Sequence, residues 1–77
     1  MTNCAVRPFP GDDDIWLVQI YGETVGEISH DATSRHIWQF HRYQPIWNNL
    51  PPKIALEAKT FAKEQCAVFN VTRRLMS

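Results

Sequence analysis

The sequence Ile-Trp-Leu-Val-Gln-Ile-Tyr occupies residues 15–21 and is the strongest strand signal in the chain. It is rich in β-branched and aromatic residues, which favour strands. Gly22 and Glu23 follow it, and a glycine at the first central position suits a type II′ hairpin turn. Residues 24–30 then read as the return strand, with Gly26 as a weak point or a bulge. We therefore predict a β-hairpin here.

The segments on either side of this hairpin give opposite signals. Residues 35–43 read Arg-His-Ile-Trp-Gln-Phe-His-Arg-Tyr and predict a third strand, reached through a turn at residues 31–34. Residues 1–13 contain Pro8 and Pro10, which block regular structure, and end in acidic loop chemistry. We expect this N-terminal segment to be irregular.

A helical pattern begins near residue 51. Asn48 and Asn49 can cap a helix, and a proline is tolerated in the first turn, where its missing N–H costs nothing. Apolar residues then recur at spacings of three, four or seven, which is typical of one buried helix face. They are Ile54, Ala58, Phe61, Ala62 and Val68 or Phe69. The pattern predicts a helix over residues 51–69.

Together these elements predict one small α+β domain over residues 1–77. A three-stranded antiparallel sheet within residues 14–43 is followed by a C-terminal amphipathic helix that packs on one of its faces. Both turns are expected to keep the shortest register, with Tyr21 opposite Thr24 and His30 opposite Arg35. The helix should then cover the larger apolar cluster, which comprises Trp16, Val18, Ile20, Val25, Trp38 and Phe40.

This register leaves a second apolar cluster on the open face of the sheet. It comprises Leu17, Tyr21, Ile28, Ile37 and Tyr43, fringed by Gln19, Gln39 and His41. A large exposed apolar patch usually marks an interface. The candidate partner-binding residues are Leu17, Tyr21, Ile37, Gln39, His41 and Tyr43. Two alternatives remain open: residues 1–13 and Ile46-Trp47 could cover this face, or a longer turn could exchange the faces of one strand.

Charge is distributed unevenly along a chain whose net charge is zero. Residues 1–31 carry six acidic side chains and one basic, whereas residues 32–77 carry seven basic and two acidic. Such asymmetry can mark a basic surface for nucleic acid. We favour attraction between the sheet and the helix within one fold, because dedicated nucleic-acid domains are usually basic overall.

Residues with catalytic or metal-binding chemistry are not arranged in a known pattern. His36 and His41 are five residues apart and would face opposite sides of one strand, and the sequence has no pair of closely spaced cysteines. Cys66 falls within the helical pattern, as a packed thiol would. We expect no enzyme activity, no metal site, no cofactor and no small-molecule substrate.

The sequence also bears on location. Residues 1–14 lack the apolar region of a secretory signal, and no apolar run approaches the length of a membrane span. We expect a cytoplasmic protein with reduced thiols and no membrane contact.

Two function classes remain. The first is a non-catalytic protein-binding domain, acting as a homodimer, an adaptor or an inhibitor through the apolar and aromatic sheet face. The alternative is a nucleic-acid-binding domain that uses the aromatic and basic third strand, where Trp38, Phe40, His41, Arg42 and Tyr43 combine rings and charge.

Overall fold

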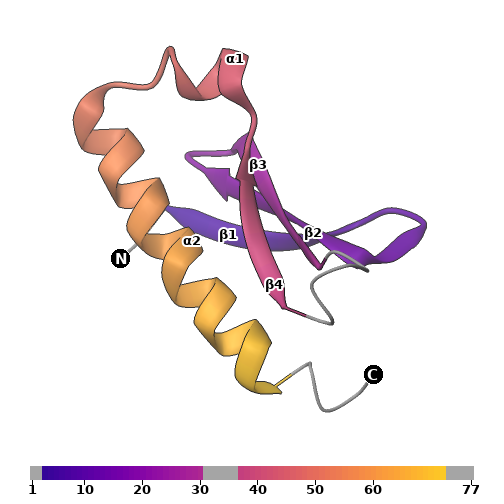
Figure 1. The fold of residues 1–77 in the computed structure, drawn as a ribbon. Coiled ribbons are helices and arrows are strands. Elements are labelled where there is room, and N and C mark those ends of the chain that lie inside the picture. Colours follow the sequence, from indigo (N-terminus) through magenta and orange to yellow (C-terminus); the bar gives the residue numbers. More distant parts are fainter. Residues whose placement is uncertain (1–2, 31–36, 73–77) are drawn as a thin grey trace.

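The computed structural model describes residues 3–30 and 37–72 and contains one antiparallel sheet with a long helix (Figure 1). The strands follow one another in the sheet in chain order, β1-β2-β3-β4. The elements are β1 (Cys4–Phe9), β2 (Asp12–Ile20), β3 (Glu23–His30), β4 (Trp38–Arg42), α1 (Gln44–Trp47) and α2 (Pro52–Thr72). The predicted turn at residues 31–34, and the start of the predicted third strand, lie outside the described residues.

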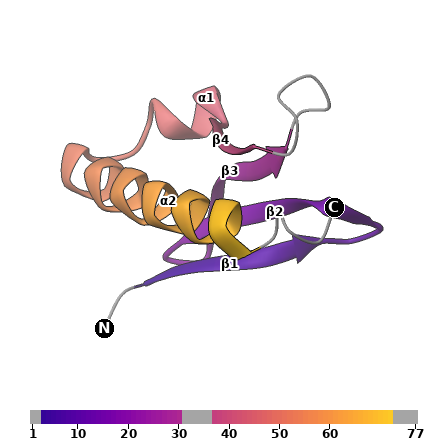
Figure 2. The same ribbon diagram turned by 60° about the horizontal axis from the view of Figure 1, so that its bottom comes forward.

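Helix α2 crosses one face of the sheet diagonally and forms a second layer (Figures 1 and 2). This arrangement confirms the predicted α+β class, with an antiparallel sheet and a C-terminal helix on one face. The predicted helix over residues 51–69 matches α2, which extends three residues further, to Thr72. The predicted number of strands was wrong, because the sheet has four strands and not three.

The additional strand is β1, within the segment that was expected to be irregular. The amide of Tyr21 donates to the carbonyl of Asn3 at 2.8 Å, so Asn3 turns its backbone toward β2. Alternation along an antiparallel strand then points the backbone groups of Cys4, Val6 and Pro8 away from the sheet. Pro8 therefore breaks no ladder hydrogen bond, since its missing N–H lies on the free edge. Proline excludes a central strand but permits this edge strand.

The turn between β2 and β3 also differs from the prediction. Tyr21 (φ 52°) and Gly22 (φ 80°) are the two central residues, and Ile20 pairs with Glu23. Two positive φ angles define a type I′ geometry, which matches the twist of the flanking strands. The expected pairing of Tyr21 with Thr24 is therefore wrong.

A bulge next to this turn shifts the register a second time. The pairing changes between Val18 and Gln19, and from that point Trp16 lies opposite Ile28. Ile28 therefore faces α2 and is fully buried, whereas the shortest register placed it on the open face. Val25, the extra residue of the bulge, is also fully buried.

The pairing of β3 with β4 also differs from the predicted register, and this second difference returns the side chains of β4 to the predicted faces. His30 lies opposite Trp38, not opposite Arg35, so the register differs from the predicted one by an odd number of residues. Two odd shifts cancel, and Trp38 and Phe40 face α2 as predicted. A Cβ on Gly26 would lie 2.5 Å from the carbonyl oxygen of His41, so only glycine allows these strands to approach this closely.

The core lies between the sheet and α2. Ala58 and Ala62 are fully buried, and their small side chains allow the helix to approach the sheet closely. The ring of Phe69 packs edge-on against Trp16 at 5.6 Å and against Trp38 at 5.3 Å. Asn70 holds the C-terminal half of α2 to β4, because its side chain accepts from the Trp38 amide at 2.7 Å and donates to the Trp38 carbonyl.

Candidate interaction surfaces

The open face of the sheet is mostly polar. Arg7 Nε donates to Gln19 Oε1 at 2.9 Å, and Gln19 Nε2 donates to Thr24 Oγ1 at 3.1 Å, so three strands are joined across this face. The strand pairing assigns to it Ala5, Arg7, Ile15, Leu17, Gln19, Thr24, Glu27, Ser29, Gln39 and His41. Ile28, a member of the apolar cluster expected here, faces the core instead. The large aliphatic side chains that the paired strands leave on this face are Ile15 and Leu17, which are both half-buried.

The structure places the six predicted site residues in three settings. Leu17, Gln39 and His41 lie on the open face, the last two exposed. Tyr21 lies in the β2–β3 turn and is 58% exposed. Ile37, 51% exposed, immediately precedes β4, and half-buried Tyr43 immediately follows it. These residues surround the open face but do not form one continuous apolar patch on it.

Tyr43 is held by a specific partner. Its hydroxyl donates to Glu27 Oε1 at 2.7 Å, which ties the end of β4 to β3. Burial, the hydrogen bond to Glu27 and the negative charge of that carboxylate raise the pKa of Tyr43 to about 12. The phenol therefore stays protonated and serves as a hydrogen-bond donor within the fold.

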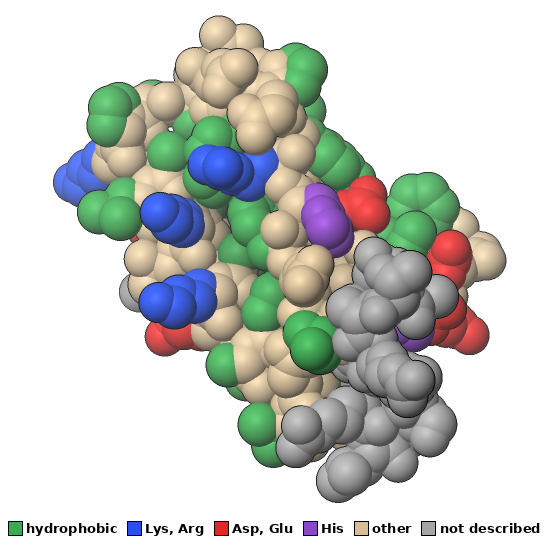
Figure 3. All heavy atoms as spheres, viewed as in Figure 1, with side chains coloured by type: hydrophobic (Ala, Val, Ile, Leu, Met, Phe, Trp, Pro, Cys, Tyr) green, Lys and Arg blue, Asp and Glu red, His purple; other side chains and the backbone are tan. Residues whose placement is uncertain are grey.

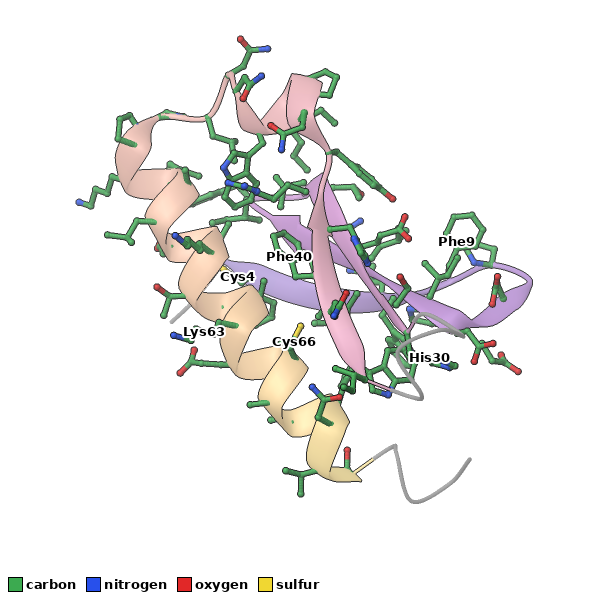
Figure 4. All side chains as sticks on the ribbon, in the orientation of Figure 1. Cys4, Phe9, His30, Phe40, Lys63 and Cys66 are labelled. Carbon is green, nitrogen blue, oxygen red and sulfur yellow. The ribbon has the colours of Figure 1, made fainter. Side chains whose placement is uncertain are left out.

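The segments that could have covered the open face pack elsewhere. Val6, Ile46 and Trp47 contact the buried core on the α2 side of the sheet. Phe9 lies at the far end of the sheet, beside the β1–β2 turn, and remains exposed (Figure 4). The alternative in which these segments cover the open face is therefore wrong for the described residues.

The aromatic rings of β4 are also directed toward the helix layer. Trp38 is buried against Phe69 and stands edge-on to His30, with ring centres 4.7 Å apart. Phe40 lies between β4 and α2 (Figure 4) and packs against Trp47. The guanidinium group of Arg42 lies over the Trp47 ring, with its Cζ atom 5.6 Å from the ring centroid. These rings are used for packing, so they present little surface on which bases could stack.

A different surface appears where the start of β1 meets α2. A groove of about 400 Å³ is lined by Cys4, Lys53, Leu56, Glu57, Thr60, Phe61 and Glu64. The helical members recur at spacings of three and four, so they form one face of α2. Leu56 is 65% exposed and Phe61 is half-buried, so apolar surface is open to solvent along the groove.

Sequence reasoning missed this groove. It assigned Phe61 to the buried face of the helix, although the structure leaves Phe61 half-buried, and it did not consider Leu56. The available signal was the face formed by positions 53, 56, 57, 60, 61 and 64, which carries two large apolar residues between charged ends. The signal is ambiguous without a structure, because only the crossing angle of α2 shows that this face overhangs the edge of the sheet.

The groove has charged ends and a protonated thiol in its lining. Burial and the nearby negative charge of Glu57 raise the pKa of Cys4, and burial raises the pKa of Cys66 on the β4 side of α2. Both are free thiols, and a raised pKa leaves little nucleophilic thiolate at neutral pH.

Titratable side chains are dispersed over the rest of the surface. One pair of them, His30 Nε2 and Asp14 Oδ1, lies 3.0 Å apart at the end of the sheet. Within residues 3–30 and 37–72, no three His, Cys, Asp or Glu side chains come close enough to hold a metal ion. In the same part of the chain, no helix is long and apolar enough to cross a membrane.

Charged side chains are unevenly distributed over the face shown in Figure 3. Basic side chains lie mainly over α2, which carries Lys53, Lys59 and Lys63, and most of the acidic side chains lie toward the other end of the sheet. The acidic end includes Asp12, Asp13 and Asp14 at the start of β2. Acidic and basic side chains therefore occur within the same small domain, and the helix that carries most of the basic side chains on this face also carries the acidic residues Glu57 and Glu64.

No protein-family model, curated protein or solved structure matches this chain.

Proposed function

We propose that this chain is a small, non-catalytic protein-binding domain. The observation that carries the proposal is the groove between α2 and the start of β1, with Leu56 exposed beside it. Leucine on a protein surface is unremarkable by itself, but apolar side chains gathered along a groove indicate an interaction site. The partner contacts the groove in this proposal, whereas the open face of the sheet was the surface expected from the sequence.

The shape of the groove favours a protein over a small molecule. Small-molecule sites usually enclose most of the ligand surface and place a few polar groups around it. Here the described lining is one helix face and a single strand residue, Cys4, so the groove is open along its length. An apolar helix or strand face fits such a surface better than a compact ligand does.

The chemistry of the described residues supports a non-catalytic role. Cys4 and Cys66 have raised pKa values, and Tyr43 is engaged with Glu27. A cytoplasmic location belongs to the same proposal, because a reducing compartment keeps both thiols free.

The test is site-specific cross-linking in extract of the source organism. A photoreactive amino acid replaces Leu56 in the full chain, and the matched control replaces Val71, which is 67% exposed on the same helix and lies outside the groove. We expect protein adducts at position 56 that are absent at position 71. Equal adducts at both positions, or none at position 56, would overturn the proposal.

Nucleic-acid binding is the alternative, and the basic side chains along α2 are the observation in its favour (Figure 3). Lys59 and Lys63 are four residues apart and so lie on one side of α2. Tight binding of a single-stranded oligonucleotide, weakened steeply by salt and by Lys59→Glu with Lys63→Glu, would replace the protein-binding proposal with this one.

A further inference from the structure

We propose that the occupant of the groove is a second copy of this chain, related to the first by a two-fold axis. The axis places the two α2 helices antiparallel, so that each groove faces the other. The inference rests on the proposed function and names its partner. A two-fold interface uses the same patch twice, so the patch must be complementary to itself.

The helical lining of the groove meets this requirement. Its positions are symmetric about the point between residues 58 and 59 of α2. When the second helix runs antiparallel about that point, Lys53 of one copy lies at the level of Glu64 of the other copy, so the basic end of each groove meets the acidic end of its partner. The same arrangement brings Leu56 to the level of Phe61, and Glu57 to the level of the Thr60 hydroxyl.

Such a pair satisfies charge and covers apolar surface together. Lys53 of each copy lies beside Glu64 of the partner subunit, which gives two equivalent ion pairs. Leu56 and Phe61 of both copies gather around the axis, where the exposed apolar groove becomes covered. The complementarity is specific to the antiparallel arrangement, because a parallel pair would bring Lys53 to Lys53 and Glu64 to Glu64.

The edge of the sheet allows the same axis. Cys4 belongs both to the groove and to β1, and it lies beside Glu57 and Phe61, close to the middle of the symmetric set. The outward backbone groups of Cys4 and Val6 can pair with the same groups of a second β1, since β1 is an edge strand. Pairing would also remove an exposed sheet edge, which natural proteins usually protect.

The first experiment measures the mass of the full chain by sedimentation equilibrium over a range of concentrations. We expect a dimer whose dissociation constant rises about 100-fold in Leu56→Lys, because two copies of the substitution enter one apolar interface. Val71→Lys is the matched control: Val71 is 67% exposed on the same helix but lies outside the groove. It should leave the dissociation constant within about 2-fold, on the usual additivity of distant sites.

The second experiment exchanges the charges at the two ends of the groove. Lys53→Glu or Glu64→Lys alone places like charges together across the axis and should weaken the dimer about 5-fold to 10-fold. The double variant restores both ion pairs and should return the affinity to within about 2-fold of the original.

The rescue discriminates between contacts within and between copies. Residues 53 and 64 are separated by about 16 Å along one helix, so they cannot contact each other within one chain. The double variant also has two acidic side chains at positions 53 and 57 of the same helix, which repel each other. Recovery of the affinity in this variant therefore has to come from a contact between the two copies. Circular dichroism melts confirm that each variant is folded.

The outcomes separate the two proposals. The proposal of a second copy is wrong if the wild-type chain is monomeric at about 100 μM, because a dissociation constant far above this value is weak for a specific complex. It is also wrong if the dimer forms but Leu56→Lys and Val71→Lys have the same effect on it. If position 56 then still cross-links to another protein, the protein-binding function stands with a different partner. If position 56 gives no protein adduct, both proposals are wrong.

Discussion

The groove beside α2 and the open face of the sheet both contain exposed apolar side chains, but their surroundings differ. On the open face, Arg7, Gln19 and Thr24 are joined by hydrogen bonds across three strands, and Tyr43 is tied to Glu27. In the groove, Leu56 is 65% exposed and lies with half-buried Phe61 between the charged side chains of Lys53 and Glu64. Apolar content alone therefore does not identify an interface, because strand register decides which apolar residues remain exposed.

The largest effect is expected at Ile28, which tests the register directly. Ile28 is fully buried, whereas Ile37 is 51% exposed, although the shortest register placed both on the open face. Ile28→Ala should lower the free energy of unfolding by about 2–5 kcal/mol, through lost burial and a residual cavity. Ile37→Ala should change it by about 0.5 kcal/mol or less. Urea denaturation measures both, and equal effects would contradict the bulged register.

A smaller effect is expected at Gly26, where β3 and β4 approach most closely. The added Cβ of Gly26→Ala would lie 2.5 Å from the His41 carbonyl oxygen and 2.6 Å from Phe40 Cε1. We expect a loss of about 1–3 kcal/mol from this overpacking. Ser29→Ala, a half-buried position on the same strand, is the control for an ordinary change in β3. A neutral Gly26→Ala in denaturant titration would show that the two strands are further apart.

Tyr43→Phe removes one hydrogen bond from the open face without changing the shape of the ring. At neutral pH the loss should be about 1 kcal/mol, because a donor to Glu27 disappears. The pKa of Tyr43 is raised to about 12 in the folded chain, above the value of about 10 for an exposed tyrosine.

The pH dependence of this contribution has a definite sign. The unfolded chain releases the phenol proton first as pH rises, so the stabilisation is complete below about pH 10 and is lost between pH 10 and 12. The unfolding free energy of the wild type should therefore fall more steeply than that of Tyr43→Phe in this window. Parallel curves, measured by denaturant unfolding at each pH, would contradict the raised pKa.

The smallest effect is expected for Ile37→Lys, which compares the two surfaces as interfaces. Ile37 is exposed beside the open face, so the variant should fold normally and keep the dissociation constant of the dimer that we propose for the wild type. Leu56→Lys, with similar exposure in the groove, should not. Sedimentation of both variants decides the comparison: loss of the dimer in Ile37→Lys alone would move the interface to the open face.

Strong local patterns in the sequence are enough to define two elements. Residues 15–20 form most of a strand because β-branched and aromatic side chains favour it, and residues 52–72 form a helix because apolar positions recur at helical spacing. It also identified most of the core, since Val18, Ile20, Val25 and Trp38 are buried as predicted. For Trp38 that success depended on two odd register shifts that cancel on β4.

The tertiary structure decided the features that depend on distant neighbours. Residues 4–9 become a strand because Pro8 lies on the free edge of a sheet, and this position is defined only when β2 pairs with it. Ile28 joins the core because the bulge at Val25, opposite Val18 and Gln19, shifts the pairing by one residue, which reverses the face of every later side chain of β3. The groove exists because α2 crosses the sheet at an angle that brings its Leu56 and Phe61 face beside Cys4. Local sequence patterns fix which residues prefer burial, but pairing and crossing angle fix which of them remain exposed.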